Sequence, residues 1–335
     1  MNYEFFMNRC IELAEMSEGH VSPNPLVGCV IVDDNGQIIA EGRHEKYGEA
    51  HAEQNALKSA GINAKGKTLF VNLEPCNHYG KTPPCSKLIV EAGIKKVIIG
   101  TKDINKKAAG GIEYLTFHGV EVEVGILEDK CKKLNEIFFF SLLHKRPFVA
   151  IKTATTLDGK IAASDNSSKW ITSDKAREEV QRLRNKYDGI LTTSKTVQID
   201  NPSLTCRMEN GRNPVRIIVD RHNILTKDYK VFNDDGTKVL TFSGEIPELM
   251  TFLYEQNIKS VLVEAGGIFN GALLKANVVD KIYQFIAPKI LGNNAGRSCY
   301  SGLSNTNINQ TINFEIEDIK TFPPDIMLEL KRLGE

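Results

Sequence analysis

Three side chains that bind zinc well and one spare carboxylate lie in two short stretches of the N-terminal half. The first stretch is His51-Ala52-Glu53, and the second runs from Glu74 to Cys85 with Cys76 near its start. One imidazole and two thiolates suit a zinc ion that keeps its fourth position open. Water at such a position ionises near neutral pH, which suits hydrolysis. In zinc deaminases a Glu two residues after the ligand His moves protons between that water and the leaving amine, and Glu53 has this spacing.

The local sequence predicts that two helix N-termini meet at this metal. Pro83-Pro84 favours a helix that opens beside Cys85, because proline is tolerated in the first turn, and residues 51–60 are typical of a second short helix. A helix N-terminus lowers a thiol pKa and so favours the thiolate that binds zinc. Two alternatives stay open: a buried His beside ordinary core cysteines, and a closed structural zinc site with His78 as fourth ligand.

Composition limits the partners and the compartment. The 335 residues allow two domains, and 42 basic side chains balance 42 acidic ones. This balance predicts no bulk attraction to nucleic acid or to a membrane, so we expect neither as a partner. The seven cysteines are odd in number and scattered, which favours a reducing cytoplasm over a disulfide framework. The N-terminus lacks the pattern of a signal peptide, and no apolar run reaches the roughly 18 residues of a membrane span.

Helix and strand patterns alternate along the chain, which predicts an α/β fold with largely parallel sheets. In the first half we expect strands at 27–32, 37–41, 67–73, 96–100 and 120–124, and helices at 2–17, from 51, from 84, after 104 and at 129–143. The turn Asp33-Asp34-Asn35-Gly36 predicts that the first two strands pair as a hairpin. In the second half we expect strands at 148–152, 189–193, 215–219, 238–242, 260–264, 281–286 and two more within 312–330, and helices at 174–187, 246–256 and 268–276. The polar, proline-terminated stretch His144-Lys145-Arg146-Pro147 predicts a boundary between domains 1–146 and 147–335.

Glycines at a strand-to-helix turn in the second half suggest an anion site. The predicted strand ends at Glu264, and Gly266, Gly267 and Gly271 follow at the start of a helix. Backbone amides at such a turn bind phosphate. The spacing differs from the usual dinucleotide fingerprint, so an ordinary packing turn is an equal alternative.

Four other side chains of the second half have two interpretations each. Arg221 follows a strand and could bind the 2′-phosphate of NADP, and Arg184 and Arg207 could be phosphate clamps. Each of the three could equally be a surface charge. Trp170, the only tryptophan, is either a core anchor or a lid over a planar ligand.

Over nearly its full length the sequence resembles the bifunctional deaminase/reductase family of bacterial riboflavin biosynthesis. The motifs of the first half are Pro23-Asn24-Pro25-Leu26-Val27-Gly28-Cys29-Val30, His51-Ala52-Glu53 and the stretch from Glu74 to Cys85. Eight residues separate the two cysteines of that stretch, where nucleoside and tRNA deaminases have two. The motifs of the second half are Thr156-Leu157-Asp158-Gly159-Lys160, Ser168-Lys169-Trp170-Ile171-Thr172-Ser173, Asp200-Asn201-Pro202-Ser203-Leu204-Thr205 and Glu264-Ala265-Gly266-Gly267.

The resemblance implies a fold and two consecutive reactions. We expect a cytidine-deaminase-like three-layer α/β domain at 1–146 and a dihydrofolate-reductase-like α/β domain at 147–335. The first would remove the 2-amino group of 2,5-diamino-6-(5-phosphoribosylamino)pyrimidin-4(3H)-one by zinc-dependent hydrolysis. The second would reduce the ribosyl group of 5-amino-6-(5-phosphoribosylamino)uracil to ribityl with NADPH. The expected partners are these small pyrimidine ribose-phosphates and further copies of the chain, in a dimer or tetramer.

Site residues follow from the resemblance at matching motif positions. His51, Cys76 and Cys85 would hold one zinc ion per chain, and Glu53 would be the catalytic proton shuttle. The residues implied for substrate are Asn24, His44, His78 and Lys81 in the deaminase and Ser168, Arg184, Leu204, Arg207 and Glu264 in the reductase. Those implied for the cofactor are Ala154, Trp170, Thr196, Asp200, Arg221, Gly266, Gly267, Ile268, Phe269, Asn270, Gly271 and Ala272. Arg221 departs from the small residue or Ser of other members, and Lys152 could help as an acid or a ligand.

Two other functions fit part of the sequence. A nucleic-acid base deaminase would share the metal chemistry but needs a basic groove, which the balanced charge does not predict. A zinc-stabilised module without activity would need four protein ligands.

Overall fold

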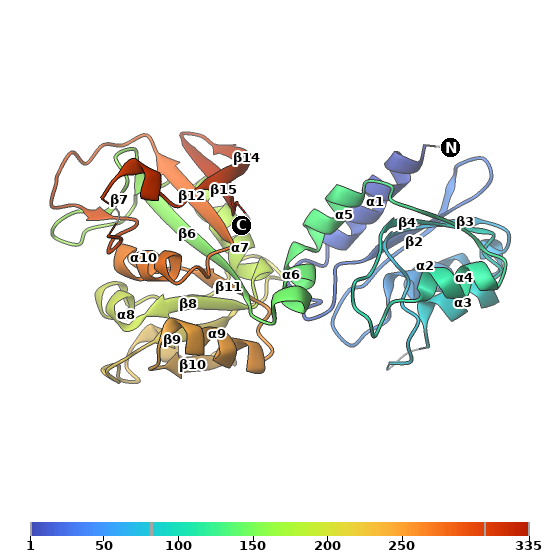
Figure 1. Ribbon diagram of the computed structural model, residues 1–335, viewed down its shortest axis with the longest axis horizontal. Coiled ribbons are helices and arrows are strands. Elements are labelled where there is room, and N and C mark those ends of the chain that lie inside the picture. The colour runs from blue at the N-terminus through green and yellow to red at the C-terminus, as the bar shows by residue number, and fades with distance from the viewer. Residues whose placement is uncertain (1, 81–82, 305, 334–335) are drawn as a thin grey trace. The chain divides into compact units, whose positions relative to one another are not determined.

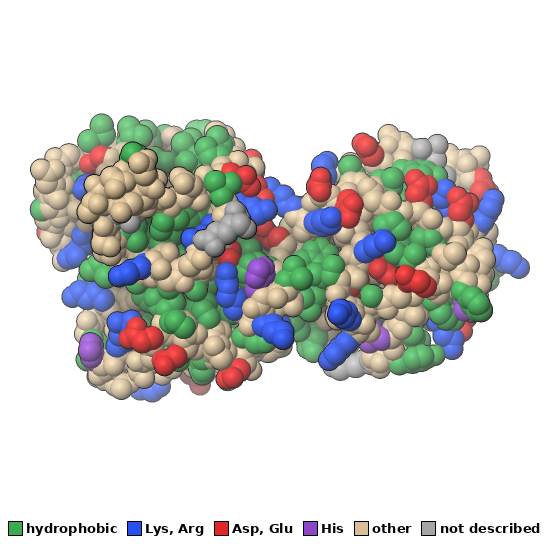
Figure 2. Space-filling model, in the orientation of Figure 1, with side chains coloured by type: hydrophobic (Ala, Val, Ile, Leu, Met, Phe, Trp, Pro, Cys, Tyr) green, Lys and Arg blue, Asp and Glu red, His purple; other side chains and the backbone are tan. Residues whose placement is uncertain are grey.

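The structure is a computed structural model that describes residues 2–80, 83–304 and 306–333. The chain divides into two compact units, Met1–His144 and Lys145–Glu335, and both are α/β units as predicted (Figure 1). None of the helices in the described ranges combines the length and the apolar character that a membrane span requires. On the face drawn in Figure 2, basic side chains lie interspersed with acidic ones rather than gathered in one stripe.

The sheet of the first unit is mixed. Its five strands have the order β2-β1-β3-β4-β5. Their bounds are β1 (Gly28–Val32), β2 (Ile38–Arg43), β3 (Thr68–Leu73), β4 (Lys96–Thr101) and β5 (Glu121–Val124). Strands β3, β4 and β5 are parallel, as predicted. Strand β1 pairs antiparallel with β2, as expected for a hairpin. It also pairs antiparallel with β3, which the prediction of a largely parallel sheet did not include. A tight turn reverses the chain after β1, and the continuous apolar run of that strand comes from burial on both faces.

Helices cover both faces of this sheet, which confirms the expected three layers (Figure 1). They are α1 (Tyr3–Glu15), α2 (Ala52–Ala60), α3 (Cys85–Glu91), α4 (Gly111–Phe117), α5 (Glu128–Leu134) and α6 (Glu136–His144), with a 3₁₀ turn at Gly61–Ala64. One core lies between the sheet and α2, α3 and α4, and a second lies between the sheet and α1 and α5. Strand β1 serves both, because successive side chains point to opposite faces.

The predicted helix 129–143 is two helices, because Asn135 interrupts it with a non-helical backbone. The buried Asn135 side chain accepts from the Leu26 N–H at 2.8 Å and donates to the Leu26 carbonyl at 2.9 Å. Asn72 donates to the same carbonyl at 2.9 Å. The hydrogen bonds of Asn135 and Asn72 therefore hold the backbone at Leu26, two residues after Asn24.

The second unit contains an eight-stranded sheet with the order β10-β9-β8-β11-β6-β12-β15-β14. Its strands are β6 (Phe148–Thr156), β8 (Gly189–Thr193), β9 (Val215–Val219), β10 (Val239–Phe242), β11 (Ser260–Val263), β12 (Lys281–Ala287), β14 (Phe314–Phe322) and β15 (Asp325–Arg332). The first six strands of the order are parallel, and β15 and β14 add antiparallel. A separate pair joins β7 (Lys160–Ala162) to β13 (Arg297–Ser298). The helices are α7 (Asp174–Lys186), α8 (Ser194–Asp200), α9 (Ile246–Glu255) and α10 (Gly267–Lys275), with 3₁₀ turns at Lys230–Phe232 and Ile308–Gln310.

Helix α2 lies unusually close to β2 at Gly42. A Cβ at Gly42 would collide with the backbone of Ala52 and Ala56. The absence of a side chain therefore sets how near the start of α2, with His51 and Glu53, can come to the sheet.

Gly42→Ala should therefore destabilise the first unit. The added methyl group forces α2 away from β2, and overpacking of this kind typically costs about 1–3 kcal/mol. The measurement is the free energy of unfolding by denaturant titration, followed by far-UV circular dichroism. Lys58→Ala, on an exposed position of α2, is the matched control and should change little. An unchanged stability in Gly42→Ala would contradict the close contact of α2 with β2.

Candidate functional site

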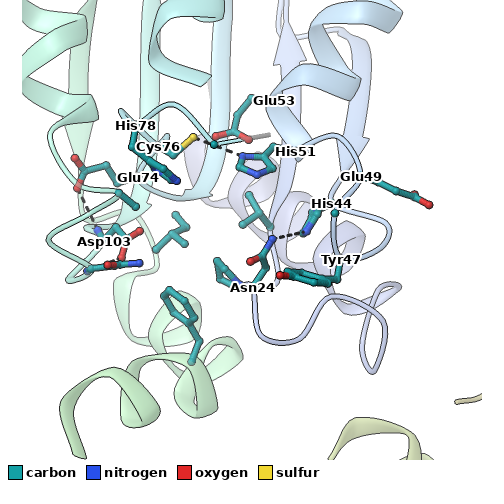
Figure 3. A pocket seen from close by; sticks show the side chains of 18 residues that line it. Asn24, His44, Tyr47, Glu49, His51, Glu53, Glu74, Cys76, His78 and Asp103 are labelled. Carbon is teal, nitrogen blue, oxygen red and sulfur yellow. Dashed lines mark hydrogen bonds between the residues drawn. The ribbon is translucent and has the colours of Figure 1, made fainter. Parts of the chain in front are cut away.

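A cavity of about 330 Å³ in the first unit is lined by two of the three predicted metal ligands, His51 and Cys76, and by Glu53 (Figure 3). This volume is in the range of small-molecule sites. The residues that line it are Asn24, Pro25, Val27, His44, Tyr47, Gly48, Glu49, His51, Glu53, Leu73, Glu74, Cys76, His78, Gly80, Asp103, Asn105, Ala108 and Phe138. The structure thus brings most of the predicted deaminase residues together, while Lys81 lies outside the described residues.

The distances between the three proposed ligands fit zinc. Their ligand atoms all lie within 4.8 Å of one another. His51 Nδ1 is 3.6 Å from Cys76 Sγ and 3.4 Å from Cys85 Sγ. Sulfur and nitrogen ligands of a tetrahedral zinc are about 3.6 Å apart, given bond lengths of about 2.3 and 2.1 Å. His78 is exposed and does not belong to this cluster, so a fourth protein ligand is missing from the part of the chain that the structure describes.

Two helix N-termini and one strand end position the ligands. His51 is the N-cap of α2, and Cys85 is the first residue of α3. Cys76 follows the end of β3 through Glu74 and Pro75. A hydrogen bond from the Cys85 thiol, with others from His51 and from the Cys85 N–H, lowers the pKa of the Cys76 thiol although burial opposes this. The site therefore favours a thiolate at Cys76 before any metal is considered. The same hydrogen bond with Cys76, together with burial, raises the pKa of the Cys85 thiol, so the lowering expected at a helix N-terminus is not found for Cys85.

Glu53 is a buried carboxylate beside this cluster. It lies in the first turn of α2 and is only 3% exposed. Burial, reinforced by the negative charge of Cys76, raises the pKa of Glu53 to about 7. A group that titrates near neutral pH can both accept and return a proton, as general acid–base catalysis requires. Figure 3 shows the Glu53 carboxylate next to Cys76 and His51.

His44 fixes the orientation of the Asn24 amide. His44 Nδ1 lies 3.0 Å from the Ala50 carbonyl oxygen, which can only accept, so Nδ1 carries the proton. His44 Nε2 then accepts from Asn24 Nδ2 at 3.1 Å (Figure 3). Burial lowers the pKa of His44 and keeps it neutral. The pair leaves Asn24 Oδ1 as an acceptor for a donor group of a ligand.

The motifs did not include several residues of the cavity wall. Asp103, Asn105 and Ala108 come from the segment between β4 and α4, and Phe138 comes from α6. Burial raises the pKa of Asp103 to about 6. These segments carry no metal-ligand spacing, so the sequence contains no local signal for them.

The second unit contains a largely buried cluster of three charges, whose side chains are 12–15% exposed. Arg184 donates to Glu264 through Nε at 2.7 Å and Nη2 at 3.0 Å, and Lys152 Nζ lies 3.2 Å from the same carboxylate. Burial opposes ionisation of Glu264, but the charges of Arg184 and Lys152 outweigh it and lower its pKa. Arg184 also donates to the Thr205 carbonyl, so its guanidinium is held in place from two sides.

The other predicted arginines are exposed. Arg207 is held by its backbone N–H, which donates to Gln181, and its side chain is exposed. Arg221 is 47% exposed and lies 3.1 Å from Glu245. Among Arg184, Arg207 and Arg221, only Arg184 forms an ion pair with little exposed surface, the one with Glu264.

Trp170 is 63% exposed, which excludes a role as a core anchor. The Arg177 guanidinium lies 4.3 Å from the centre of its ring, and Lys289 donates to its carbonyl oxygen. The ring therefore offers one face at the surface of the unit.

The remaining predicted positions of this unit lie on a strand, on a helix and in two loops, which hold Ser168 and Leu204. Leu204 is buried in a small core, and Ala154 lies on β6. Ser168 is half-buried. Thr196 and Asp200 lie at the two ends of α8, where the Thr196 N–H donates to the side chain of the capping Thr193.

The glycine turn divides into a packed side and an open side. A Cβ on Gly267 or Gly271 would collide with carbonyl oxygens of the segment 298–301. Asn270 is fully buried and donates to a carbonyl of the same segment at 3.0 Å. The packing alternative therefore describes these three residues, and their contact with a cofactor stays a prediction.

The open side is the start of α10. A Cβ on Gly266 would meet no atom within 4 Å, and Ile268 is 75% exposed. Phe269 and Ala272 pack against the core of the unit. Within this turn, Gly266 is thus the glycine that a phosphate could approach closely.

Comparison with known proteins covers both units. Residues 1–101 match the family of the cytidine and deoxycytidylate deaminase zinc-binding region, and residues 147–328 match the RibD C-terminal domain. The riboflavin biosynthesis protein RibD of Bacillus amyloliquefaciens is 39% identical over 97% of this chain and 95% of its own length. That of Escherichia coli (strain K12) is 36% identical over 98% and 99%.

A solved structure agrees with these relatives. The diaminohydroxyphosphoribosylaminopyrimidine deaminase/5-amino-6-(5-phosphoribosylamino)uracil reductase of Thermotoga maritima is 42% identical and covers 99% of both chains with a TM-score of 0.92. Family matches and relatives together span the zinc cavity of the first unit and the charged cluster of the second. The chain therefore belongs to the RibD family, the bifunctional deaminases and reductases of riboflavin biosynthesis.

Proposed function

We propose that this chain catalyses two consecutive reactions, one in each unit. The deaminase domain, residues 1–146, hydrolyses the 2-amino group of 2,5-diamino-6-(5-phosphoribosylamino)pyrimidin-4(3H)-one. The reductase domain, residues 147–335, reduces the ribosyl group of 5-amino-6-(5-phosphoribosylamino)uracil to ribityl with NADPH. The observation that carries the first assignment is the cluster of His51, Cys76 and Cys85 with the buried Glu53 beside it.

In the deaminase, the residues of the chain hold the substrate and move two protons in turn. His51, Cys76 and Cys85 would hold a zinc ion, which would supply the Lewis acidity that lets water ionise near neutral pH. A carboxylate oxygen of Glu53 carries the first proton of the attacking water to the ring nitrogen beside C2 as the new C2–O bond forms. It then carries the second proton, from the hydroxyl now on C2, to the amine, which leaves as ammonia as the C2–N bond breaks. Asn24 Oδ1, fixed by His44, accepts a hydrogen bond from a donor on the pyrimidine. The balance is one water consumed and one ammonia released.

In the reductase, fixed charges orient the substrate and the cofactor. Glu264 stays negative between Arg184 and Lys152 and can accept hydrogen bonds from ribose hydroxyls. The exposed Arg207 guanidinium suits the substrate phosphate, and Arg221 suits the 2′-phosphate of NADPH. The open backbone at Gly266 and the exposed ring of Trp170 suit the pyrophosphate and a planar ring of the cofactor.

We also propose a cytoplasmic homo-oligomer, a dimer or tetramer. The cytoplasm is supported by seven free cysteines, which suit a reducing compartment. Association is supported by the edge strand β14, where Ile316 and Ile319 are exposed among charged neighbours, because the free backbone groups of an edge strand can pair with another chain.

Cys85→Ser should lower the zinc content from one ion per chain. Serine removes the thiolate and leaves two ligands. Elemental analysis of the purified protein measures this. Cys206→Ser, at a half-buried cysteine of the second unit, is the matched control and should keep the wild-type content. Equal zinc in the two variants would show that the ligand assignment is wrong.

Glu53→Gln should keep zinc but lose deamination. The amide has a similar volume but cannot accept and return a proton, and such groups typically contribute about 10²–10⁴-fold. Ammonia release measures the effect. Reduction of separately supplied deaminated substrate is the internal control and should be unchanged. Full deamination by this variant would mean that the carboxylate has only a structural role.

In the full-length chain, Arg207→Ala should affect substrate affinity and Arg221→Ala should affect cofactor preference. Hydrogen bonds to charged groups contribute about 1.5–3 kcal/mol, or about one to two decades in affinity. Arg207→Ala should raise KM for the phosphorylated substrate by that factor, and Arg221→Ala should narrow the preference for NADPH over NADH. Steady-state kinetics measures KM for the substrate and the NADPH/NADH preference in both variants, so that each variant is the control for the other. An unchanged cofactor preference in Arg221→Ala would mean that other groups bind the 2′-phosphate.

A further inference from the structure

Glu74 is a buried carboxylate that none of the steps above uses. It lies two residues before Cys76 and is 6% exposed. Its Oε2 accepts from the Asp103 N–H at 3.1 Å. Its Oε1 accepts from three backbone N–H groups at the start of α4, those of Gly110 at 3.1 Å, Gly111 at 3.0 Å and Ile112 at 3.2 Å. One side chain therefore satisfies four backbone donors of a segment remote in sequence.

The segment that Glu74 holds forms one wall of the cavity. Asp103, Asn105 and Ala108 line the cavity, and all three lie between the end of β4 and the start of α4. The backbone of the metal segment adds a second tie, since the Asn77 N–H donates to the Ala108 carbonyl at 2.8 Å. The hydrogen bonds that hold this wall therefore come from Glu74 and Asn77, on either side of Cys76.

Close packing leaves this junction little freedom. A Cβ on Gly111 would collide with the Pro75 carbonyl oxygen, so the start of α4 rests directly on the metal segment. On its other side, Asn77 Oδ1 accepts from the Ser86 hydroxyl at 2.8 Å, and Ser86 belongs to α3. Residues 74–77 thus join the starts of two helices.

The metal centre lies within the match to the zinc-binding region of deaminases, whereas the wall lies outside it. The match to the zinc-binding region of deaminases ends at residue 101, and it includes Glu53 and the three ligands. The wall residues Asp103, Asn105 and Ala108 lie beyond it. Glu74 is the point where a shared metal centre is attached to a wall that the general match does not include.

We propose that Glu74 is a positioning residue that sets substrate affinity in the deaminase by holding the wall 103–108 at a fixed distance from Cys76. This inference rests on the proposed deaminase function. Glu74 does not touch the reacting atoms in this account, because its carboxylate is occupied by the four backbone donors. Losing it should loosen the wall while the ligands and Glu53 stay in place.

The test compares Glu74→Gln with the wild type in the full-length chain. Glutamine keeps one acceptor oxygen but turns an NH₂ group toward a backbone N–H, so part of the wall is released. We expect KM for the diaminopyrimidine substrate to rise about ten- to a hundredfold, the range for lost hydrogen bonds to a charged group. kcat and zinc content should stay close to wild type, as should the reductase activity.

Glu113→Gln is the matched control. Glu113 lies in the first turn of the same helix and is exposed, so this change removes the same charge without touching the wall, and KM should not move. A loss of zinc, or a lower kcat at unchanged KM, would overturn the proposal in favour of a role in the metal site. A lower melting temperature with both kinetic constants unchanged would reduce Glu74 to a structural residue.

If Glu74→Gln folds poorly, a second variant and a second measurement still test the proposal. Glu74→Asp keeps the charge but is one methylene shorter, and its KM should lie between those of the wild type and the glutamine variant. Hydrogen exchange of the amides of residues 103–112 should be faster in both variants, and unchanged exchange would overturn the proposal. If the wild type released no ammonia, the proposed function would fail, whereas the exchange result would still report on the wall.

Discussion

The first unit depends on one constraint: three ligand atoms from three separate segments must lie within 4.8 Å of one another. His51 and Cys85 satisfy it because each stands at the start of a helix, and Cys76 satisfies it because it follows the end of β3. Helix N-termini and the carboxyl ends of parallel strands meet at one edge of an α/β sheet. The constraint therefore extends to whatever sets the distance of these helices from the sheet, which at α2 is the missing side chain of Gly42.

The second unit satisfies a different constraint with the same architecture. Glu264 follows β11, and Arg184 reaches it from α7, so a parallel strand end again presents the polar group. Here two cationic side chains, Arg184 and Lys152, balance the charge of Glu264. A buried ion pair of this kind is costly to form and costlier to break, which keeps the geometry of this site fixed before substrate arrives.

Most elements could be predicted where the sequence has strong local signals. Strands 189–193 and 215–219 match the observed bounds, because buried parallel strands read as apolar runs between polar ends. Helix α8 was missed, since it follows β8 without a break, and β7 and β13 are too short to show a period. The turn after β1 predicts its antiparallel pairing with β2, but an apolar run does not specify that β3, on the other side of β1, is antiparallel as well.

The candidate sites divide in the same way. The zinc residues and Glu53 lie in compact motifs, and the resemblance added the substrate residues by position. Neither could show that Asn270 points inward to the segment 298–301, that Arg184 is paired with Glu264, or that Phe138 reaches the cavity. These facts depend on contacts between segments far apart in the chain, which no local pattern contains.

Three glutamates with little exposed surface show how the surroundings assign a role to one residue type. Glu264 has two cations beside it, which hold its charge and lower its pKa. Glu74 has four backbone donors, which occupy its oxygens and fix its position. Glu53 has neither, so burial raises its pKa to about 7. Of the three, Glu53 has the weakest set of groups that hold its charge, hydrogen bonds with the Cys85 side chain and with its own backbone N–H that burial outweighs, so it can release and regain a proton at the least cost. The carboxylate that is least satisfied is therefore the one suited to proton transfer, and the two that are well satisfied are suited to hold the walls of their sites.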